Sequence, residues 1–329
     1  MATIVITDIA WPSAAIETEL AHAAGHEILL AESDEHLLTL APQADAILTC
    51  FRRVTAPVLD AAERCLTVAR YGVGVDNIDV DCATDLGILV SNVPEFCTEE
   101  VADHALALAL ATLRNLIPAT DAIRSGGWTP EAAHPSRRLR GLVFGVVGFG
   151  STGRAVAERA AAFGFEVVVS SRALAADPSA APPSVTRVVE RDELFGLADV
   201  VSLHVPLNAE TRYLVSAREL GMMKDGTLLI NVGRGGLVDT EALRPELDRG
   251  RLRAALDVID PEPLPADHWL RSSPAALITP HVAFASDGSL IELATKAMSN
   301  VLAVLAGGCP PSIVNPDVLT SHVLRSIPQ

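Results

Sequence analysis

A glycine-rich turn between a predicted strand and a predicted helix constrains this chain more than any other feature. The apolar run 142–147 is short enough for one buried strand, it leads into Gly148-x-Gly150-x-x-Gly153, and residues 155–163 have the composition of a helix. In this arrangement the first glycine allows a tight turn, the second lets the backbone approach a pyrophosphate, and the third lets helix and strand pack closely. The helix N-terminus also offers free N–H groups to the anion. The turn therefore predicts a dinucleotide-binding site.

Composition and charge narrow the class of protein. A chain of 329 residues with 49% hydrophobic residues is long enough for two domains with cores of their own. The net charge of −16, from 25 basic and 41 acidic residues, argues against a nucleic-acid partner or an anionic membrane surface. The five cysteines are odd in number and lack CxxC spacing, so neither a disulfide framework nor a metal site is predicted. No leader is evident and the apolar stretches are expected to be too short for a bilayer, so we expect a cytoplasmic protein.

The order of predicted elements indicates two parallel α/β domains. Short apolar strands alternate with helices in the first hundred residues and again over 142–283. The glycine-rich loop 70–79 follows one of the first strands, at the edge where open α/β sheets bind ligands, although a plain turn is the alternative. The helix predicted over 288–305 is long enough to return to the first domain, which would make that domain discontinuous. Pro245 is expected to break or kink the helical segment 240–249.

A predicted helix and the stretch after it suggest an assembly. The helix over 98–113 is apolar nearly all round and must be buried, by its own sheet, by a second subunit, or by both, which we favour. Residues 120–140 are polar, contain glycines and prolines, and are too long for an ordinary connection. A segment that wraps a neighbouring subunit is preferred over a disordered loop.

Cofactor choice is predicted from the strand that follows the glycine turn. Sites that select NAD place an Asp or Glu at the end of this strand to bind the ribose 2′-hydroxyl, whereas an Arg accommodates the 2′-phosphate of NADP. This chain has Ser171 and Arg172 there, and no carboxylate within 167–172. Because a guanidinium is a charged, multidentate anion ligand, NADP(H) is predicted over NAD(H). The alternative is that Arg172 only ends a solvated strand.

Three later strand ends carry polar residues that suit a proton and hydride transfer. Arg234, Glu262 and His281 each follow a predicted buried strand and should emerge on the carboxyl edge of the same sheet. An Arg can bind a carboxylate and polarise the adjacent carbonyl, a His can move the proton, and a Glu can hold the imidazole. Each residue alone has an ordinary structural explanation, but three of them after a nucleotide turn favour a catalytic set.

The chain resembles the D-isomer-specific 2-hydroxyacid dehydrogenase family over nearly its whole length. The motifs that carry the resemblance occur in family order, and those at 71–79, 99–104 and 280–284 are most similar to the phosphoglycerate dehydrogenase and C-terminal-binding-protein branch. They are Tyr71-Gly72-Val73-Gly74-Val75-Asp76-Asn77-Ile78-Asp79, Glu99-Glu100-Val101-Ala102-Asp103-His104, Gly148-Phe149-Gly150-Ser151-Thr152-Gly153, Asn231-Val232-Gly233-Arg234-Gly235-Gly236, Asp257-Val258-x-x-x-Glu262-Pro263 and Thr279-Pro280-His281-Val282-Ala283-Phe284.

The resemblance implies the fold and the reaction. Two doubly wound domains are expected: a Rossmann dinucleotide-binding domain at 98–283, inserted into a flavodoxin-like substrate domain made of 1–97 and 284–329. The implied reaction is hydride transfer between NAD(P)H and the carbonyl of a small 2-oxo acid, giving a D-2-hydroxy acid, or the reverse. The alternative in the same branch is a cofactor-sensing, corepressor-like interaction protein. The assembly that the resemblance implies is a homodimer through the dinucleotide-binding domains.

The resemblance also implies a role for individual residues. Arg234 would bind the carboxylate and carbonyl of the substrate, His281 would be the general acid/base, and Glu262 would be its partner. The residues implied in substrate binding are Arg70, Val73, Gly74 and Phe284, the middle two through backbone N–H groups. Those implied in cofactor binding are Gly148, Phe149, Gly150, Ser151, Thr152 and Gly153 at the pyrophosphate, Ser171 and Arg172 at the ribose, His204, Val205 and Pro206 beside the adenosine, Asp257 facing the nicotinamide carboxamide, and Thr211, Asn231, Val232 and Gly233.

Overall fold

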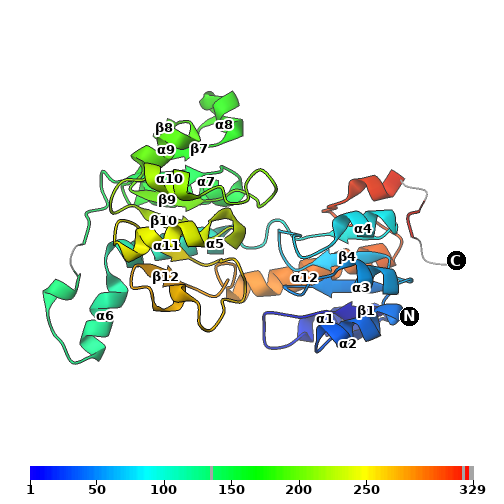
Figure 1. Cartoon of the computed structure of the whole chain (residues 1–329). Coiled ribbons are helices and arrows are strands. Elements are labelled where there is room, and N and C mark those ends of the chain that lie inside the picture. The colour runs from blue at the N-terminus through cyan, green and yellow to red at the C-terminus, as the bar shows by residue number, and fades with distance from the viewer. Residues whose placement is uncertain (134–135, 321–322, 326–329) are drawn as a thin grey trace. The chain divides into compact units, whose positions relative to one another are not determined.

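The computed structural model describes residues 1–133, 136–320 and 323–325. The chain divides into two compact units, one made of Met1–Phe96 with Ser286–Gln329 and the other of Cys97–Ala285. Each unit is built on its own parallel sheet with helices on both faces (Figure 1). The predicted fold class, two parallel α/β domains, is therefore confirmed.

The first unit contains a five-stranded sheet in the order β2-β1-β3-β4-β5, with every pair parallel. Apolar residues such as Val5, Ile47 and Val68 fill its interior. The elements along the chain are β1 (Thr3–Ile6), α1 (Ala15–Ala23), β2 (Glu27–Leu30), α2 (Asp34–Leu40), η1 (Ala41–Gln43), β3 (Ala46–Thr49), α3 (Ala56–Ala61), β4 (Thr67–Arg70), α4 (Val80–Asp85), β5 (Leu89–Ser91), α12 (Asp287–Leu305) and η6 (Pro316–Thr320).

Helix α12 completes this unit from the far end of the chain, as its length predicted. A capping box between Ser286 and Ser289 begins the helix, which packs on α1, β3 and β4. By length and composition alone α12 could cross a membrane, as could α5 and α6 together, a pair bent by 61°. The expectation that every apolar stretch is too short for a bilayer is thus wrong for α12. Half of its apolar window is buried in the unit, as in the core helix of a globular domain.

The second unit contains a seven-stranded parallel sheet in the order β12-β11-β10-β9-β6-β7-β8. The order of strands along the chain reverses beside β6, which is the first strand of the unit and lies inside the sheet between β9 and β7. The elements are α5 (Thr98–Leu113), α6 (Leu116–Arg124), η2 (Pro130–Ala133), β6 (Val143–Val147), α7 (Ser151–Ala162), β7 (Glu166–Ser170), α8 (Arg172–Ala176), η3 (Pro178–Ala180), β8 (Arg187–Val188), α9 (Arg191–Leu197), β9 (Val200–Leu203), α10 (Ala217–Met222), β10 (Leu228–Asn231), η4 (Gly235–Leu237), α11 (Thr240–Asp248), β11 (Arg253–Leu256), η5 (Trp269–Ser272) and β12 (Ala276–Ile278).

Two layers of helices cover this sheet. Helices α5 and α7 pack together on one face, where Ala105 and Leu106 join Phe144 and Val156 in one apolar cluster. Helices α9, α10 and α11 contribute to the cluster on the other face. The apolar helix predicted over 98–113 is thus covered within its own unit. Pro245 lies inside α11 and does not end it, so the expected break is wrong.

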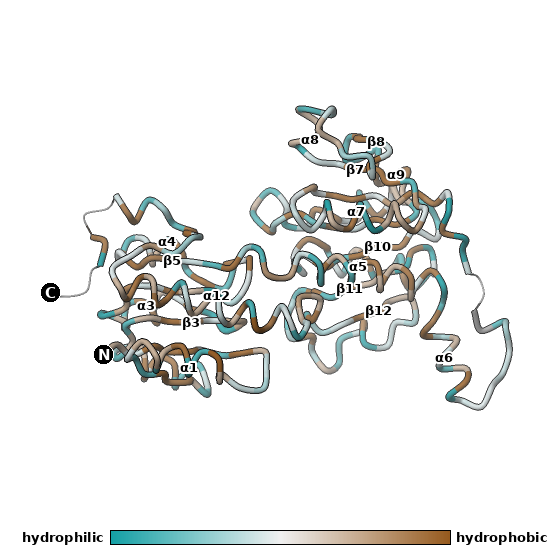
Figure 2. The backbone as a smooth tube through the Cα atoms, turned by 180° about the vertical axis from the view of Figure 1, so that it is seen from behind, coloured by the Kyte–Doolittle hydropathy of each residue, from teal (hydrophilic) through white to brown (hydrophobic). Residues whose placement is uncertain are grey.

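The segment predicted as a long polar loop is partly helical. Helix α6 occupies Leu116–Arg124 and the short η2 occupies Pro130–Ala133, while residues 134–135 lie outside the described ranges. Figures 1 and 2 show α6 standing away from the sheet of its unit. Leu116, Ile117 and Ile123 are about half exposed and Trp128 is 89% exposed. The segment therefore presents apolar side chains on its surface.

Candidate active site

The glycine turn has the geometry that its sequence predicts. Gly148 adopts a φ of 93°, and a Cβ on it would lie 2.4 Å from the carbonyl oxygen of His204. A Cβ on Gly153 would lie 2.4 Å from the carbonyl oxygen of Gly148, so α7 can pack against β6 only without a side chain there. Gly150 differs, because within the described chain no atom outside its immediate neighbours comes within 4 Å of its Cβ position. The turn thus leaves open space at the start of α7.

The side chains around this turn come from the start of α7 and from the loop after β9. Ser151 and Thr152 form the first turn of α7, and the guanidinium of Arg154 stacks 4.9 Å above the ring of Phe149. His204 follows β9, and its Nε2 lies 2.8 Å from Ser202 Oγ. Burial lowers the pKa of His204 to about 4, so its imidazole is neutral at physiological pH.

The predicted adenosine and ribose residues lie on neighbouring loops. After His204, Val205 and Pro206 continue from β9, and the Thr211 hydroxyl donates to the Pro206 carbonyl at 2.6 Å. β7 ends at Ser170, Ser171 is the N-cap residue of α8, and Arg172 is the first residue of that helix. The guanidinium of Arg172 lies 3.4 Å from the carboxylate of Glu210, and these two side chains are 92% and 76% exposed. Sequence reasoning had not included Glu210.

A tight turn after β10 places Arg234. The buried Asn231 amide donates to the Arg234 carbonyl at 2.8 Å and its oxygen accepts from the Gly233 N–H at 3.1 Å. Asn231 thus shapes the turn, and Val232 is buried within it. A Cβ on Gly235 would lie 2.1 Å from the backbone of Ile259. The turn that carries Arg234 is therefore pressed against the loop that leads to Glu262.

The predicted acid/base pair is brought together. His281 Nδ1 lies 2.8 Å from Glu262 Oε2, while the other Glu262 oxygen accepts the Ile259 N–H at 2.9 Å. His281 has a φ of 53°, a left-handed conformation uncommon for a residue with a side chain. The ring of Phe284 lies edge-on to the imidazole with 6.1 Å between ring centres. A histidine oriented by a carboxylate is suited to proton transfer.

Asp257 is buried beneath this loop. Its carboxylate accepts the Thr279 hydroxyl at 2.6 Å and the N–H groups of Val282 and Ala283 at 2.9 Å each. The expected contact of Asp257 with a nicotinamide carboxamide stays a prediction, since these bonds face the loop. His104 from α5 reaches the same place, with Nε2 3.0 Å from Thr279 Oγ1. His104 and Thr279 are functional candidates that the sequence marked only as motif residues.

The predicted substrate-binding loop belongs to the first unit. Arg70 ends β4, is buried, and donates from Nε to Asn77 Oδ1 at 3.2 Å. A Cβ on Gly72 would lie 2.9 Å from an Arg70 nitrogen. Val73 is 49% exposed, and its carbonyl accepts the Asn92 amide at 2.7 Å. The loop is thus ordered by its own polar contacts, and Gly74 follows Val73 within it.

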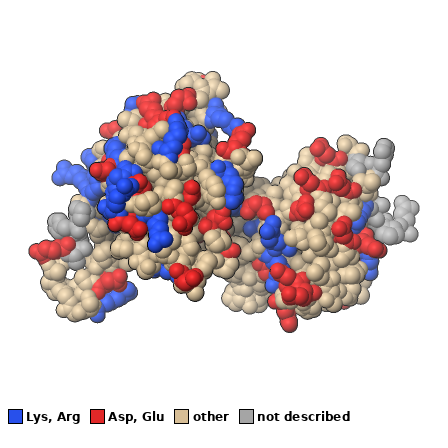
Figure 3. Space-filling view, viewed as in Figure 1, with Lys and Arg blue, Asp and Glu red and all other residues tan. Residues whose placement is uncertain are grey.

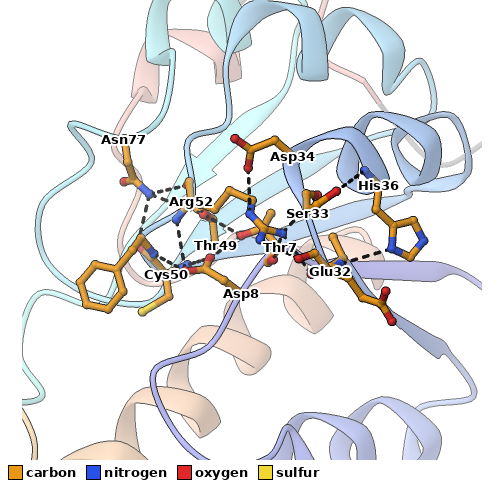
Figure 4. A network of polar contacts seen from close by, with 12 residues as sticks. Thr7, Asp8, Glu32, Ser33, Asp34, His36, Thr49, Cys50, Arg52 and Asn77 are labelled. Carbon is orange, nitrogen blue, oxygen red and sulfur yellow. Dashed lines mark hydrogen bonds and ion pairs between the residues drawn. The ribbon is translucent and has the colours of Figure 1, made fainter. Parts of the chain in front are cut away.

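A polar network holds the adjacent loop after β3 (Figure 4). The Asp8 carboxylate accepts the N–H groups of Cys50, Phe51 and Arg52 at 2.8–3.2 Å. Asn77 donates to the carbonyls of Cys50 and Arg52, which ties this loop to the one after β4. Sequence reasoning missed Asp8 and Arg52, because their partners are backbone groups far along the chain.

No group of three or more His, Cys, Asp or Glu side chains that could hold a metal ion occurs in the described ranges. Burial raises the pKa of the Cys50 and Cys65 thiols to about 12. These two cysteines are therefore unreactive core residues.

Lys and Arg side chains are interspersed with Asp and Glu side chains on the face of the molecule shown in Figure 3.

Comparison with known proteins identifies the family. The sequence profile of the NAD-binding domain of D-isomer-specific 2-hydroxyacid dehydrogenases matches residues 106–283. The chain belongs to this family. It is 38% identical to a glyoxylate reductase from Aeropyrum pernix over 87% of each chain, and 37% identical to a hydroxypyruvate reductase from Thermotoga maritima over 76% of this chain and 81% of the relative. A crystal structure of a protein from Thermus thermophilus superposes with a TM-score of 0.86 at 38% identity, over 95% of this chain and 99% of that one.

Family membership settles the class of reaction. The protein is an NAD(P)-dependent oxidoreductase that reduces 2-oxo acids to D-2-hydroxy acids, and the corepressor-like alternative is not favoured. The relatives named here are glyoxylate and hydroxypyruvate reductases, so they do not support the specific resemblance to the phosphoglycerate dehydrogenase and C-terminal-binding-protein branch.

Proposed function

We propose that this protein is an NADPH-preferring reductase of small 2-oxo acids, with glyoxylate and hydroxypyruvate as substrates. The names of the similar relatives support these two acids. The observation that carries the proposal is the 2.8 Å contact between His281 Nδ1 and Glu262 Oε2, on the unit that also carries the glycine turn. Because Nδ1 is bound to the carboxylate, Nε2 is the ring nitrogen that we assign to the substrate oxygen.

In the proposed reaction each residue of the set has one task. Arg234 binds the carboxylate of the 2-oxo acid and polarises the carbonyl beside it. A reduced nicotinamide cofactor, when bound at the glycine turn, would supply the hydride for the carbonyl carbon. His281 gives its Nε2 proton to the carbonyl oxygen, so the C=O double bond becomes an alcohol and the imidazole becomes neutral. Glu262 accepts the Nδ1 hydrogen bond throughout and keeps the ring oriented.

The open space at Gly150 fits a pyrophosphate, since backbone N–H groups at the start of α7 border it. We assign the predicted cofactor residues to this binding surface. They are Gly148, Phe149, Gly150, Ser151, Thr152, Gly153, Ser171, Arg172, His204, Val205, Pro206, Thr211, Asn231, Val232, Gly233 and Asp257. His204 is neutral, so we propose that it borders the adenosine without contributing a charge.

The preference for NADPH is proposed from the end of β7. Ser171 and Arg172 follow the strand directly, and residues 167–172 contain no carboxylate that would repel a 2′-phosphate. Glu210 is the ionic partner of the Arg172 guanidinium, and the pair is exposed, so it stabilises the fold little. A phosphate dianion can therefore replace Glu210 at this guanidinium.

The other unit is proposed to bind the substrate. In this assignment the substrate domain predicted at 1–97 and 284–329 corresponds to the unit of Met1–Phe96 with Ser286–Gln329, and the backbone N–H groups of Val73 and Gly74 take the substrate carboxylate. Arg70 adds positive charge beside them. Phe284 belongs to the unit of His281, and we propose that it limits the size of the acid. Hydrogen bonds of Asp8 and Arg70 hold the loops after β3 and β4, which supports a preformed site.

A homodimer through the dinucleotide-binding domains and a cytoplasmic location complete the proposal. The exposed apolar residues of α6 and the segment after it, with Trp128 at 89% exposure, support a partner surface. Trp128→Asp is expected to shift the protein from dimer to monomer in analytical ultracentrifugation. A monomeric wild-type protein would contradict this part.

The proposed function is tested with a panel of 2-oxo acids and both reduced cofactors, followed by loss of nicotinamide absorbance. We expect the highest kcat/KM with glyoxylate or hydroxypyruvate and NADPH. His281→Gln should abolish turnover while NADPH still binds. Turnover of only large or branched 2-oxo acids, or full activity of His281→Gln, would overturn the proposal.

A further inference from the structure

A hydrogen-bond chain lies beneath the loop that carries His281, and the reaction as described does not use it. The chain runs from His104 on α5 to Thr279 after β12, and from Thr279 to Asp257 after β11. His104 Nε2 lies 3.0 Å from Thr279 Oγ1, and Thr279 Oγ1 lies 2.6 Å from Asp257 Oδ1. All of these residues and His281 belong to one compact unit. Residues from α5, from the end of β11 and from the end of β12 thus meet beside the backbone of the loop that carries His281.

The direction of each hydrogen bond follows from the groups themselves. A carboxylate can only accept, so the short bond to Asp257 takes the single proton of the Thr279 hydroxyl. Thr279 Oγ1 must then accept from His104, which requires a proton on His104 Nε2. His104 Nε2 also lies 3.5 Å from Asp257 Oδ1. His104 is therefore a donor that orients the hydroxyl toward the buried carboxylate.

Asp257 connects these side-chain hydrogen bonds to the backbone of His281. Its backbone carbonyl accepts the His281 N–H at 2.8 Å, and its carboxylate accepts the next two backbone N–H groups, those of Val282 and Ala283. Three consecutive N–H groups are thus bound to one residue. A left-handed φ of 53° is unfavourable for His281 and persists only where the surroundings impose it. The clamp formed by Asp257 supplies that constraint.

We infer that Thr279 and His104 are positioning residues for the proton transfer at His281. They touch no reacting atom; they fix the rotation of the Asp257 carboxylate, and through it the backbone of the loop that aims the imidazole. The inference rests on the proposed role of His281. Thr279 and His104 can affect the reaction without touching the substrate, because a displacement of the imidazole by about 1 Å can change the rate by roughly a hundredfold.

Two matched pairs of substitutions test the inference. Thr279→Val keeps the shape but removes the hydroxyl, whereas Thr279→Ser keeps the hydroxyl. His104→Leu removes the donor, whereas His104→Gln retains an N–H at nearly the same distance. We expect kcat to fall about tenfold to a hundredfold in Thr279→Val, and less in His104→Leu, with the Kd for NADPH within about threefold of wild type. The Ser and Gln variants should recover most of the lost kcat.

The outcomes separate this inference from the proposed function. If all four variants retain kcat within about twofold while His281→Gln is inactive, the positioning role is wrong and the role of His281 stands. If kcat and NADPH affinity fall together in the Val and Leu variants, or the Ser and Gln variants lose as much kcat, the role is merely structural and the inference is overturned. Full activity of His281→Gln would refute the proposed function itself.

Discussion

Substitutions in the glycine turn can distinguish an effect on cofactor affinity from an effect on stability, because Gly150 and Gly153 have different surroundings. A Cβ on Gly153 would lie 2.4 Å from the Gly148 carbonyl oxygen, which is a backbone atom and cannot rotate away. Restoring an ordinary contact distance requires α7 to move about 1 Å from β6, and overpacking of this kind costs about 1–3 kcal/mol. Gly153→Ala should therefore lower the free energy of unfolding by that amount, and the Tm by several degrees.

Gly150→Ala should behave in the opposite way. Gly150 has a φ of −74°, which alanine adopts readily, and its Cβ position faces open space. Substitution of a glycine at a compatible φ leaves stability unchanged or raises it by about 0.4–1 kcal/mol. The added methyl group would nevertheless occupy the path of the pyrophosphate, so the Kd for NADPH should rise at least about tenfold, or roughly 1.4 kcal/mol.

Thermal melts and fluorescence titration with NADPH measure both effects on the same samples, with wild-type protein as the control. The expected pattern is a lower Tm for Gly153→Ala, and a wild-type Tm with weak NADPH binding for Gly150→Ala. Unchanged NADPH affinity in Gly150→Ala would refute the assignment of the open space to a ligand. A wild-type Tm for Gly153→Ala would refute the close packing of α7 on β6.

Two further predictions concern charged residues of the same unit. Burial acts to raise the pKa of Asp199, but hydrogen bonds from the Val143 N–H and Arg137 outweigh it and hold the pKa below the ordinary value of 3.8. Since the folded-state pKa is lowered, this carboxylate stabilises the fold above about pH 4 and loses its contribution as pH falls further. Asp199→Asn should therefore flatten the dependence of the unfolding free energy on pH in this acidic range. An unchanged pH dependence would contradict this role of Asp199. Glu210→Gln should lower the KM for NADPH about two- to fivefold and leave that for NADH unchanged, because it removes a negative charge beside Arg172. Equal effects on both cofactors in initial-rate kinetics would refute that role for Glu210.

The features predicted from sequence are those that depend on neighbouring residues. The strand at 142–147 and the three glycines specify a local turn, and the structure reproduces it because each glycine meets backbone atoms or open space. The three strand ends with Arg234, Glu262 and His281 followed from parallel topology, since parallel strands bring their carboxyl ends to one edge.

The features that were missed depend on contacts between distant segments. Asp8 binds three backbone N–H groups more than forty positions away, and His104 reaches Thr279 across 175 positions. No local pattern encodes such pairs. The second half of α6, from residue 120 to 124, was expected as part of a loop over 120–140, because the glycine- and proline-containing continuation obscured an ordinary helix. Pro245 was expected to break or kink the helical segment 240–249; α11 continues through it, and the buried Leu243 and Leu247 keep the helix packed on both sides of it.

The configuration of the product tests the proposed reaction at its centre. Hydroxypyruvate and NADPH would be incubated with the protein, and the glycerate formed would be resolved by chiral chromatography, with His281→Gln as the matched control. We expect D-glycerate from the wild-type protein and none from the variant. Formation of L-glycerate, or no turnover of any small 2-oxo acid with either cofactor, would contradict the proposed reaction.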